Sequence, residues 1–105
     1  MSDKKRAIQV TGKELSIVKS ILKDLLHGER VLVFGSRARG THKTTSDLDL
    51  AIVSDTPMTI STRSRLEFAF SEADLPFRVD IVDLLSVEAG FQRVIQDDSV
   101  ELDYR

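Results

Sequence analysis

Three aspartates on two strand-like segments are the residues of this sequence whose types and spacing best suit catalysis. Asp47 and Asp49 are two residues apart in the alternating segment 47–53, so both carboxylates are expected on one face of a strand, about 7 Å apart at their Cα atoms. Asp80 lies in a second alternating segment and completes a cluster of three carboxylates if the two strands are neighbours. Such a cluster is strongly repulsive without a cation, and its oxygen ligands suit Mg²⁺ or Mn²⁺.

A short glycine-containing turn precedes the acids in the chain. Gly35 and Ser36 follow directly on the apolar run 31–34, and Arg37 and Arg39 come next. Glycine lets the backbone approach a ligand closely, and the N–H groups and hydroxyl of such a turn can face phosphate oxygens, with the two guanidinium groups close by. Taken alone, this segment is more simply explained as an ordinary exit from a strand, and any single aspartate as a solvated surface charge.

Hydrophobic periodicity predicts the elements that must position these residues, and together they form an α/β (α+β) domain with a small mixed sheet of three to four strands and helices packed on it. In chain order we expect a helix over 13–27, a strand over 31–34, a turn over 37–45 with room for one helical turn, a strand over 47–53, a helix over 60–73, a strand over 78–84, a third helix carrying Val87, Phe91, Val94 and Ile95, and a short edge strand with Val100, Leu102 and Tyr104.

Local signals predict where these helices begin and end. Thr11 and Glu14 fit a capping box at the start of the first helix, and Gly28 suits its end. Ser86 is a candidate cap for the third helix. Residues 1–10 are charged at the start and are expected to fray, so the whole chain is one domain with a loose N-terminus.

Composition excludes several classes of protein. The chain has 105 residues, a net charge of −2 and no cysteine, which rules out disulfides, thiolate metal sites and a cysteine nucleophile. The slight acidic excess argues against a protein whose main task is direct binding of nucleic acid. No apolar run is long enough to span a membrane or to serve as a signal peptide, so we expect a cytoplasmic protein without a membrane partner.

The spacing of the two motifs is distinctive when they are taken together. Gly35-Ser36, ten further residues and Asp47-Leu48-Asp49 resemble the signature of the DNA polymerase β-like nucleotidyltransferase superfamily. The local text around both motifs is similar to the superfamily's small branch, the minimal nucleotidyltransferases (MNT), over residues 13 to 104. Asp80, in the text Val-Asp-Ile-Val, matches the position of the family's third acid.

This resemblance implies a fold, a site and a reaction. The fold is the polymerase β-like palm, in which Gly35 and Ser36 bind the triphosphate and Arg37 and Arg39 are weaker candidates for the same task. Asp47, Asp49 and Asp80 hold Mg²⁺, with Mn²⁺ as a substitute. The acceptor oxygen attacks the α-phosphorus of ATP and pyrophosphate is released, so the protein contributes mainly positioning and charge neutralisation.

The short chain narrows the resemblance further. Larger relatives carry a helical domain for the acceptor, whereas stand-alone MNT proteins are paired with a HEPN-domain toxin encoded nearby. The resemblance therefore implies an antitoxin that transfers AMP to a tyrosine of its HEPN partner within a hetero-oligomer. Two alternatives stay open: a nucleotide-binding or purely steric antitoxin without catalysis, and a transferase for a small molecule such as an aminoglycoside.

Other conspicuous residues are expected to be structural. His27 suits the end of a helix, His42 a solvated loop, and Tyr104 an edge strand. Asp83 is close to Asp80 in sequence but projects to the opposite face of a regular strand. The aromatic side chains are expected in the core or on a partner-facing surface; they are Phe68, Phe70, Phe77 and Phe91.

Overall fold

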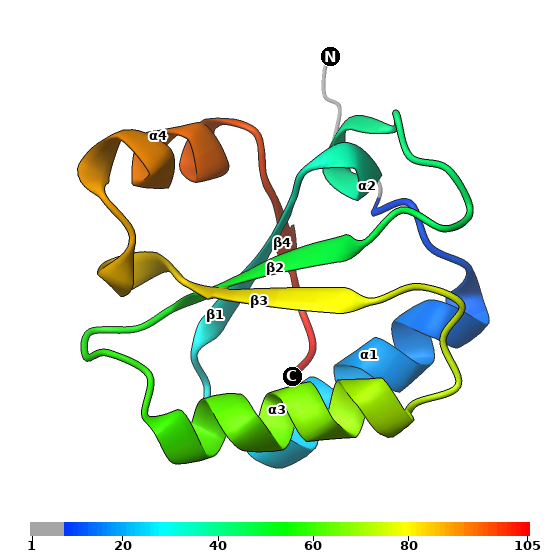
Figure 1. Cartoon of the computed structure of the whole chain (residues 1–105), viewed down its shortest axis with the longest axis horizontal. Helices are drawn as coiled ribbons and strands as arrows, with labels where there is room; N and C mark the ends of the chain where they lie inside the picture. Colours follow the sequence, from blue (N-terminus) through cyan, green and yellow to red (C-terminus); the bar gives the residue numbers. More distant parts are fainter. Residues whose placement is uncertain (1–7) are drawn as a thin grey trace.

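In the computed structural model, which describes residues 8–105, one sheet runs through the middle of the molecule between two layers of helices (Figure 1). The strands lie in the order β3-β2-β1-β4. β1 is antiparallel to both β2 and β4, while β2 and β3 are parallel, which confirms the predicted mixed sheet. The strands are β1 (Arg30–Phe34), β2 (Leu48–Val53), β3 (Val79–Asp83) and β4 (Val100–Leu102).

The helices divide between the two faces of this sheet. α1 (Gly12–Leu25) and α3 (Ile60–Glu72) cover the lower face in Figure 1. The short α2 (Ser36–Arg39) and α4 (Ala89–Asp97) lie on the upper face, together with a 3₁₀ turn, η1 (Leu84–Ser86). None of the helices within residues 8–105 combines the length and the apolar character needed to cross a bilayer.

α1 begins as the sequence predicts but ends earlier. The Thr11 hydroxyl accepts a hydrogen bond from the Glu14 N–H at 3.1 Å, and the Glu14 carboxylate accepts one from the Thr11 N–H at 2.9 Å, which completes the capping box. The predicted stop at Gly28 is wrong, because the helix ends at Leu25 and Leu26 turns into the core. Gly28 instead takes a positive φ of 103° in the turn that leads to β1.

The N-terminal segment differs from the predicted frayed end where the structure describes it. Residues 1–7 lie outside the described part of the chain. Residues 8–10 are docked rather than frayed, since the Gln9 N–H donates to the Arg37 carbonyl at 2.9 Å and both Ile8 and Val10 pack against the main core. The prediction that residues 8–10 fray is wrong because Ile8 and Val10 are apolar and pack against the core, whereas the charged residues of this segment all lie before them.

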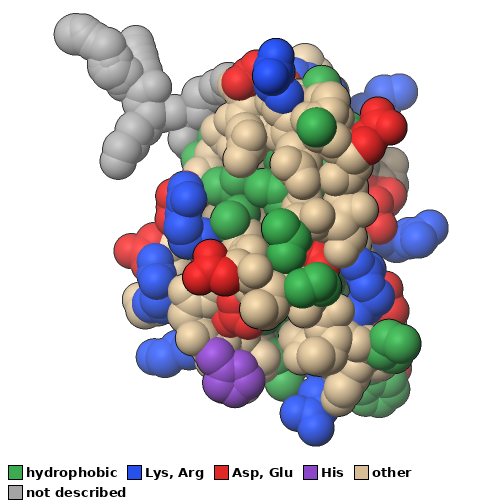
Figure 2. Space-filling view, turned by 90° about the vertical axis from the view of Figure 1, so that its left-hand side faces the viewer, with side chains coloured by type: hydrophobic (Ala, Val, Ile, Leu, Met, Phe, Trp, Pro, Cys, Tyr) green, Lys and Arg blue, Asp and Glu red, His purple; other side chains and the backbone are tan. Residues whose placement is uncertain are grey.

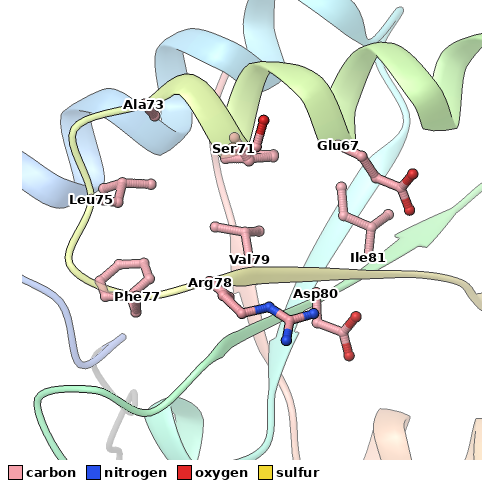
Figure 3. Close-up of a pocket in the computed structure, with 10 residues that line it drawn as sticks. Glu67, Ser71, Ala73, Leu75, Phe77, Arg78, Val79, Asp80 and Ile81 are labelled. Atoms are coloured by element: carbon pink, nitrogen blue, oxygen red, sulfur yellow. The ribbon is translucent and has the colours of Figure 1, made fainter.

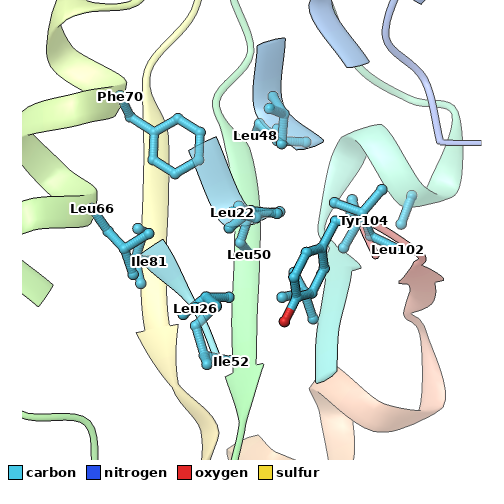
Figure 4. Packing of buried hydrophobic residues seen from close by; sticks show 14 of the residues in the cluster. Leu22, Leu26, Leu48, Leu50, Ile52, Leu66, Phe70, Ile81, Leu102 and Tyr104 are labelled. Atoms are coloured by element: carbon cyan, nitrogen blue, oxygen red, sulfur yellow. The ribbon is translucent and has the colours of Figure 1, made fainter. Parts of the chain in front are cut away.

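The main core lies between the sheet and the two long helices (Figure 4). Alternation along β2 directs Leu48, Leu50 and Ile52 into it, where they meet Leu22 of α1 and Leu66 of α3. Each such side chain contributes roughly 1.5–3 kcal/mol through its removal from water. This layer packs against one face of β2 and β3, and the opposite face of the same strands carries Asp49 and Asp80.

The C-terminal part contains one wrong prediction and one confirmed one. Ser86 does not cap a helix, because it lies in η1 and its hydroxyl donates to the buried Asp83 carboxylate at 2.9 Å, while α4 begins after Glu88. The short edge strand exists as β4, paired with β1. Tyr104 follows it, is buried, and donates its hydroxyl to the Glu29 carbonyl.

Several large apolar side chains remain on the surface. Figure 2 shows hydrophobic side chains gathered near the middle of one face, with acidic and basic side chains around them. The exposed large apolar residues are Ile60, Phe68, Leu85, Phe91 and Val94.

Candidate active site

Two strands bring the predicted acids together at the start of β2 and β3. In the parallel ladder Asp49 lies directly opposite Asp80, so the two side chains project from the same face of the sheet. The backbones of neighbouring strands lie about 4.8 Å apart. Asp47 immediately precedes β2 and is exposed. Asp83 lies opposite Ile52 and points to the other side, as its odd spacing from Asp80 predicts.

The raised pKa of the Asp49 carboxyl reflects, in part, how close these acids lie to one another. Burial raises the pKa of the Asp49 carboxyl to about 6, and repulsion from Asp80 and then Asp47 contributes to this rise, while the Arg39 guanidinium lowers the pKa. A carboxylate that is hard to ionise because other carboxylates are close is typical of a site that gains from a divalent cation.

The donor set fits Mg²⁺, although the three carboxylates do not converge on a single point. Within residues 8–105, no three acidic or histidine side chains already have the spacing of a closed metal site. Asp47 and Asp80 are exposed, so their side chains can rotate toward Asp49 without disturbing the core. All three offer carboxylate oxygens, the ligands that Mg²⁺ prefers, and the repulsion at Asp49 is what such an ion would relieve.

Phe34 is a member of this site that sequence reasoning missed. It lies opposite Asp49 on β1, and its ring meets Phe91 of α4 edge-on, with ring centroids 6.3 Å apart. This apolar neighbour helps to explain why burial is the largest cause of the raised pKa at Asp49. The sequence places Phe34 directly before Gly35, which hints at a position near the site. Only the register between β1 and β2 shows that it lies opposite Asp49.

Gly35 lies directly against Asp49, so the turn and the acids form one site. A Cβ built on Gly35 would be 2.4 Å from the Asp49 carboxylate oxygen Oδ2, which is closer than any real contact. The backbone there also has a φ of +76°, a conformation that other residues rarely adopt. Only glycine fits this position, and it brings the half-buried Ser36, the first residue of α2, next to the acids.

Arg37 has a different role from the predicted phosphate contact. Its side chain is only 3% exposed, and its guanidinium group donates four hydrogen bonds to backbone carbonyls. It also stacks on Phe77, with its central carbon 4.2 Å from the ring centroid. A group so fully engaged has little left for a ligand, so its position argues against a nucleotide contact. The accepting carbonyls belong to Gln9, Lys43, Thr44 and Ser46.

Through these bonds Arg37 holds in place the loop that leads to Asp47. Three of the four carbonyls lie between α2 and β2, and Phe77 lies just before β3. Burial of a cation with bonds to several carbonyls is costly to undo, because each carbonyl would lose its partner. The sequence could not separate Arg37 from Arg39, since both occur in the same short motif.

Arg39 remains available for a ligand. Its side chain is 48% exposed and forms an ion pair with Asp98 at 3.1 Å. It is also close enough to Asp49 to lower the pKa of that carboxyl. An exposed pair of this kind is weak, so an anionic ligand beside the acids can compete for the guanidinium group.

Comparison with known proteins identifies this arrangement. The family model described as "Polymerase beta, Nucleotidyltransferase" matches residues 17–103. The chain belongs to this family. A curated relative from Haemophilus influenzae, "Probable protein adenylyltransferase MntA", is 45% identical over 89 residues, which cover 85% of this chain and 78% of the relative. The protein is therefore a nucleotidyltransferase, as the motif spacing indicated.

Solved structures with the same fold come from toxin–antitoxin complexes. A chain of a toxin–antitoxin complex with AMP-PNP has a TM-score of 0.72 at 24% identity, covering 85% of this chain and 72% of that chain. A chain from the complex of tri-AMPylated HEPN toxin of Shewanella oneidensis with MNT antitoxin has a TM-score of 0.61 at 22% identity, covering 87% and 71%. At these identities the two structures show that the fold is shared.

Proposed function

We propose that this protein is an antitoxin that transfers AMP from ATP to a hydroxyl, most simply that of a tyrosine, on a HEPN-domain partner. The observation that carries the proposal is the pairing of Asp49 with Asp80 directly beside Gly35. That pairing supports one site in which a triphosphate and an acceptor oxygen can meet. The names of the relatives, a protein adenylyltransferase and MNT–HEPN complexes, support the choice of a protein as acceptor.

Each residue has a role that follows from its chemistry. Asp47, Asp49 and Asp80 would hold Mg²⁺, which when bound neutralises charge on the triphosphate. The turn at Gly35 and Ser36 would bind phosphate oxygens through N–H and hydroxyl groups. Arg39 would leave Asp98 to meet the same phosphates.

The transfer itself is a displacement at phosphorus. The acceptor oxygen forms a bond to the α-phosphorus of ATP while the bond from that phosphorus to the bridging oxygen breaks, and pyrophosphate leaves with the electron pair. Asp80 is exposed and lies on the edge strand β3 beside Asp49, so it is our candidate to orient the acceptor hydroxyl and receive its proton. We place this reaction in the cytoplasm, where ATP is available.

Mass analysis of the partner tests the proposal. The HEPN-domain protein encoded beside this chain is incubated with the protein, ATP and Mg²⁺, and its intact mass should rise by one or more AMP units. Asp47→Asn should abolish the increase, and chelation of the metal should do the same. A partner whose mass stays unchanged under all conditions would overturn the proposal.

Two further assays, of partner neutralisation and of aminoglycoside modification, separate the alternatives. A steric antitoxin would still neutralise its partner when Asp47→Asn and Asp49→Asn are combined, whereas a catalytic one would not. A transferase for small molecules would modify an aminoglycoside and leave the partner protein untouched. The exposure of Asp47 and Asp80 favours a protein acceptor, which brings its own binding surface.

A further inference from the structure

A groove beside Asp80 has no part in the function described so far. Its cavity of about 420 Å³ lies between the second half of α3 and β3. Glu67 and Ser71 of α3 line one side, and Arg78, Val79 and Asp80 line the other (Figure 3). Its volume falls within the range of roughly 300–1,000 Å³ that is typical of binding sites.

The strand that forms this groove is an edge of the sheet. Within residues 8–105, no strand lies on the outer side of β3. The Arg78 carbonyl accepts from the Leu48 N–H at 2.9 Å and so faces β2, which directs the backbone groups of Val79 and Ile81 outward. The Ile81 carbonyl indeed faces outward, since it accepts from the Arg63 guanidinium at 2.9 Å.

We propose that the acceptor protein binds here through an extended segment, which pairs with the outer edge of β3 and presents its hydroxyl beside Asp80. The inference rests on the proposed transfer to a protein hydroxyl and adds the docking site for that protein. Arg63 already occupies the Ile81 carbonyl, so the outward groups left for a partner are the N–H and C=O of Val79 and the N–H of Ile81. Such groups are matched by another polypeptide backbone, and pairing of this kind is a common mode of peptide recognition. A small molecule has no repeating backbone to satisfy such an edge.

The order of the strands supports the assignment. Gly35 follows β1, on one side of β2, whereas the free edge of β3 lies on the other side. Asp49 and Asp80 lie between them. The triphosphate and the acceptor would therefore reach the acids from opposite sides, as a displacement at phosphorus requires.

The alternation of β3 also specifies the pattern of the bound segment. A residue paired opposite Asp80 would project from the same face as Asp80, with Cβ atoms about 5 Å apart. Its two neighbours would project to the other face, toward the side of β3 that carries Val79 and Ile81 (Figure 3). We expect a segment in which a hydroxyl-bearing residue is flanked by apolar ones.

Val79→Pro is the sharpest variant for this inference. Val79 is the first residue of β3, where proline is tolerated, and its outward N–H is lost while the bonds to β2 remain. Val79→Ala is the matched control, because it shortens the side chain and keeps the N–H. The KM for the co-expressed HEPN-domain protein should rise about tenfold in Val79→Pro and much less in the control, with the Kd for ATP unchanged in both.

A second variant tests the groove without altering the backbone. Ser71→Trp fills the space between α3 and β3, and Ser64→Trp places the same side chain on the same helix outside the groove. Ser71→Trp should weaken transfer to the HEPN-domain protein by a rise in KM, and Ser64→Trp should behave like the unmodified protein.

The outcomes separate this inference from the proposed function. If the unmodified protein transfers AMP and both Ser71→Trp and Val79→Pro keep its KM for the HEPN-domain protein, the docking site is wrong and the function stands. If Val79→Pro does not fold, the pair at Ser71 and Ser64 decides alone. If the unmodified protein transfers nothing to the partner, both proposals are overturned.

Discussion

On the face that α1 and α3 cover, β2 contributes Leu48, Leu50 and Ile52, whose side chains are almost completely removed from water. On the opposite face the same strand contributes Asp49 and then Ala51, beneath a thinner cover of α2 and α4. The first face gains free energy from burial, while the second holds acids that repel one another.

The contrast teaches how a chain of 105 residues can maintain a repulsive site. The larger apolar core on one face fixes most of the backbone. On the other face a smaller buried cluster of Leu32, Ala51, Leu84 and Ile95 packs beside the acids, so the acids need no favourable contacts of their own. Functional sites commonly reduce stability in this way, and the cost is met by packing elsewhere. Variants on the two faces should therefore have opposite effects on stability and activity.

Asp49→Asn should give the largest effect. Loss of one acid should lower AMP transfer by about 10³-fold, roughly 4 kcal/mol of the barrier, because the charge that balances the cation is removed. The same variant should be at least as stable as the parent, because it relieves repulsion from Asp80 and Asp47. Transfer assays and thermal melting measure the two effects, and a variant that loses stability would contradict the contrast between the faces.

Leu50→Ala, one residue away on the opposite face, should do the reverse. Leu50 is completely buried, so its truncation should lower the free energy of unfolding by about 3 kcal/mol through lost burial and a residual cavity. Transfer per folded molecule should change little, because the acids stay on their strand. Urea denaturation gives the stability, and a cost below about 1 kcal/mol would show that the core can collapse around the gap.

Arg37→Lys should lower stability by about 2 kcal/mol, because lysine cannot replace four bonds to carbonyls or the stacking on Phe77. Arg39→Lys is the matched control, and its exposed ion pair should contribute less than about 0.5 kcal/mol. Urea denaturation of both variants makes the comparison. Equal stabilities would mean that Arg37 does not hold the loop before Asp47.

The pH dependence of stability should show the smallest effect. The pKa of Asp49 lies near 6 in the folded protein against 3.8 ordinarily, so the folded state keeps a proton that the unfolded chain has already released. The free energy of unfolding should thus fall as pH rises from about 4 to about 6, by about 1 kcal/mol once solvent screening at this half-buried group is considered.

Metal-free protein in a chelating buffer is the sample for this measurement. Asp49→Asn should lack this part of the decline, so the difference between the two curves isolates the carboxyl. Two parallel curves would mean that burial and repulsion do not act on Asp49.

The fold and the acids were predictable because they depend on local patterns. Alternation in 47–53 separates Asp47 and Asp49 from the apolar face, and the same alternation separates Asp80 from Asp83. Capping at Thr11 and Glu14 was predictable because both partners lie within one turn. The prediction that Ser86 caps a helix was wrong because its hydroxyl donates to the buried Asp83 carboxylate instead. Preferences for capping residues take no account of such a tertiary partner.

By itself the sequence determined the order of the main strands and helices, the face on which each acid lies, and the spacing between the turn and the acids. Only the tertiary structure decided that Asp49 lies opposite Asp80, that Gly35 leaves no space for a side chain, and that Arg37 is buried while Arg39 is exposed. The physical reason is that side-chain direction follows from the backbone within a few residues. Register and burial depend instead on contacts between segments that are far apart in the chain and compete for the same space.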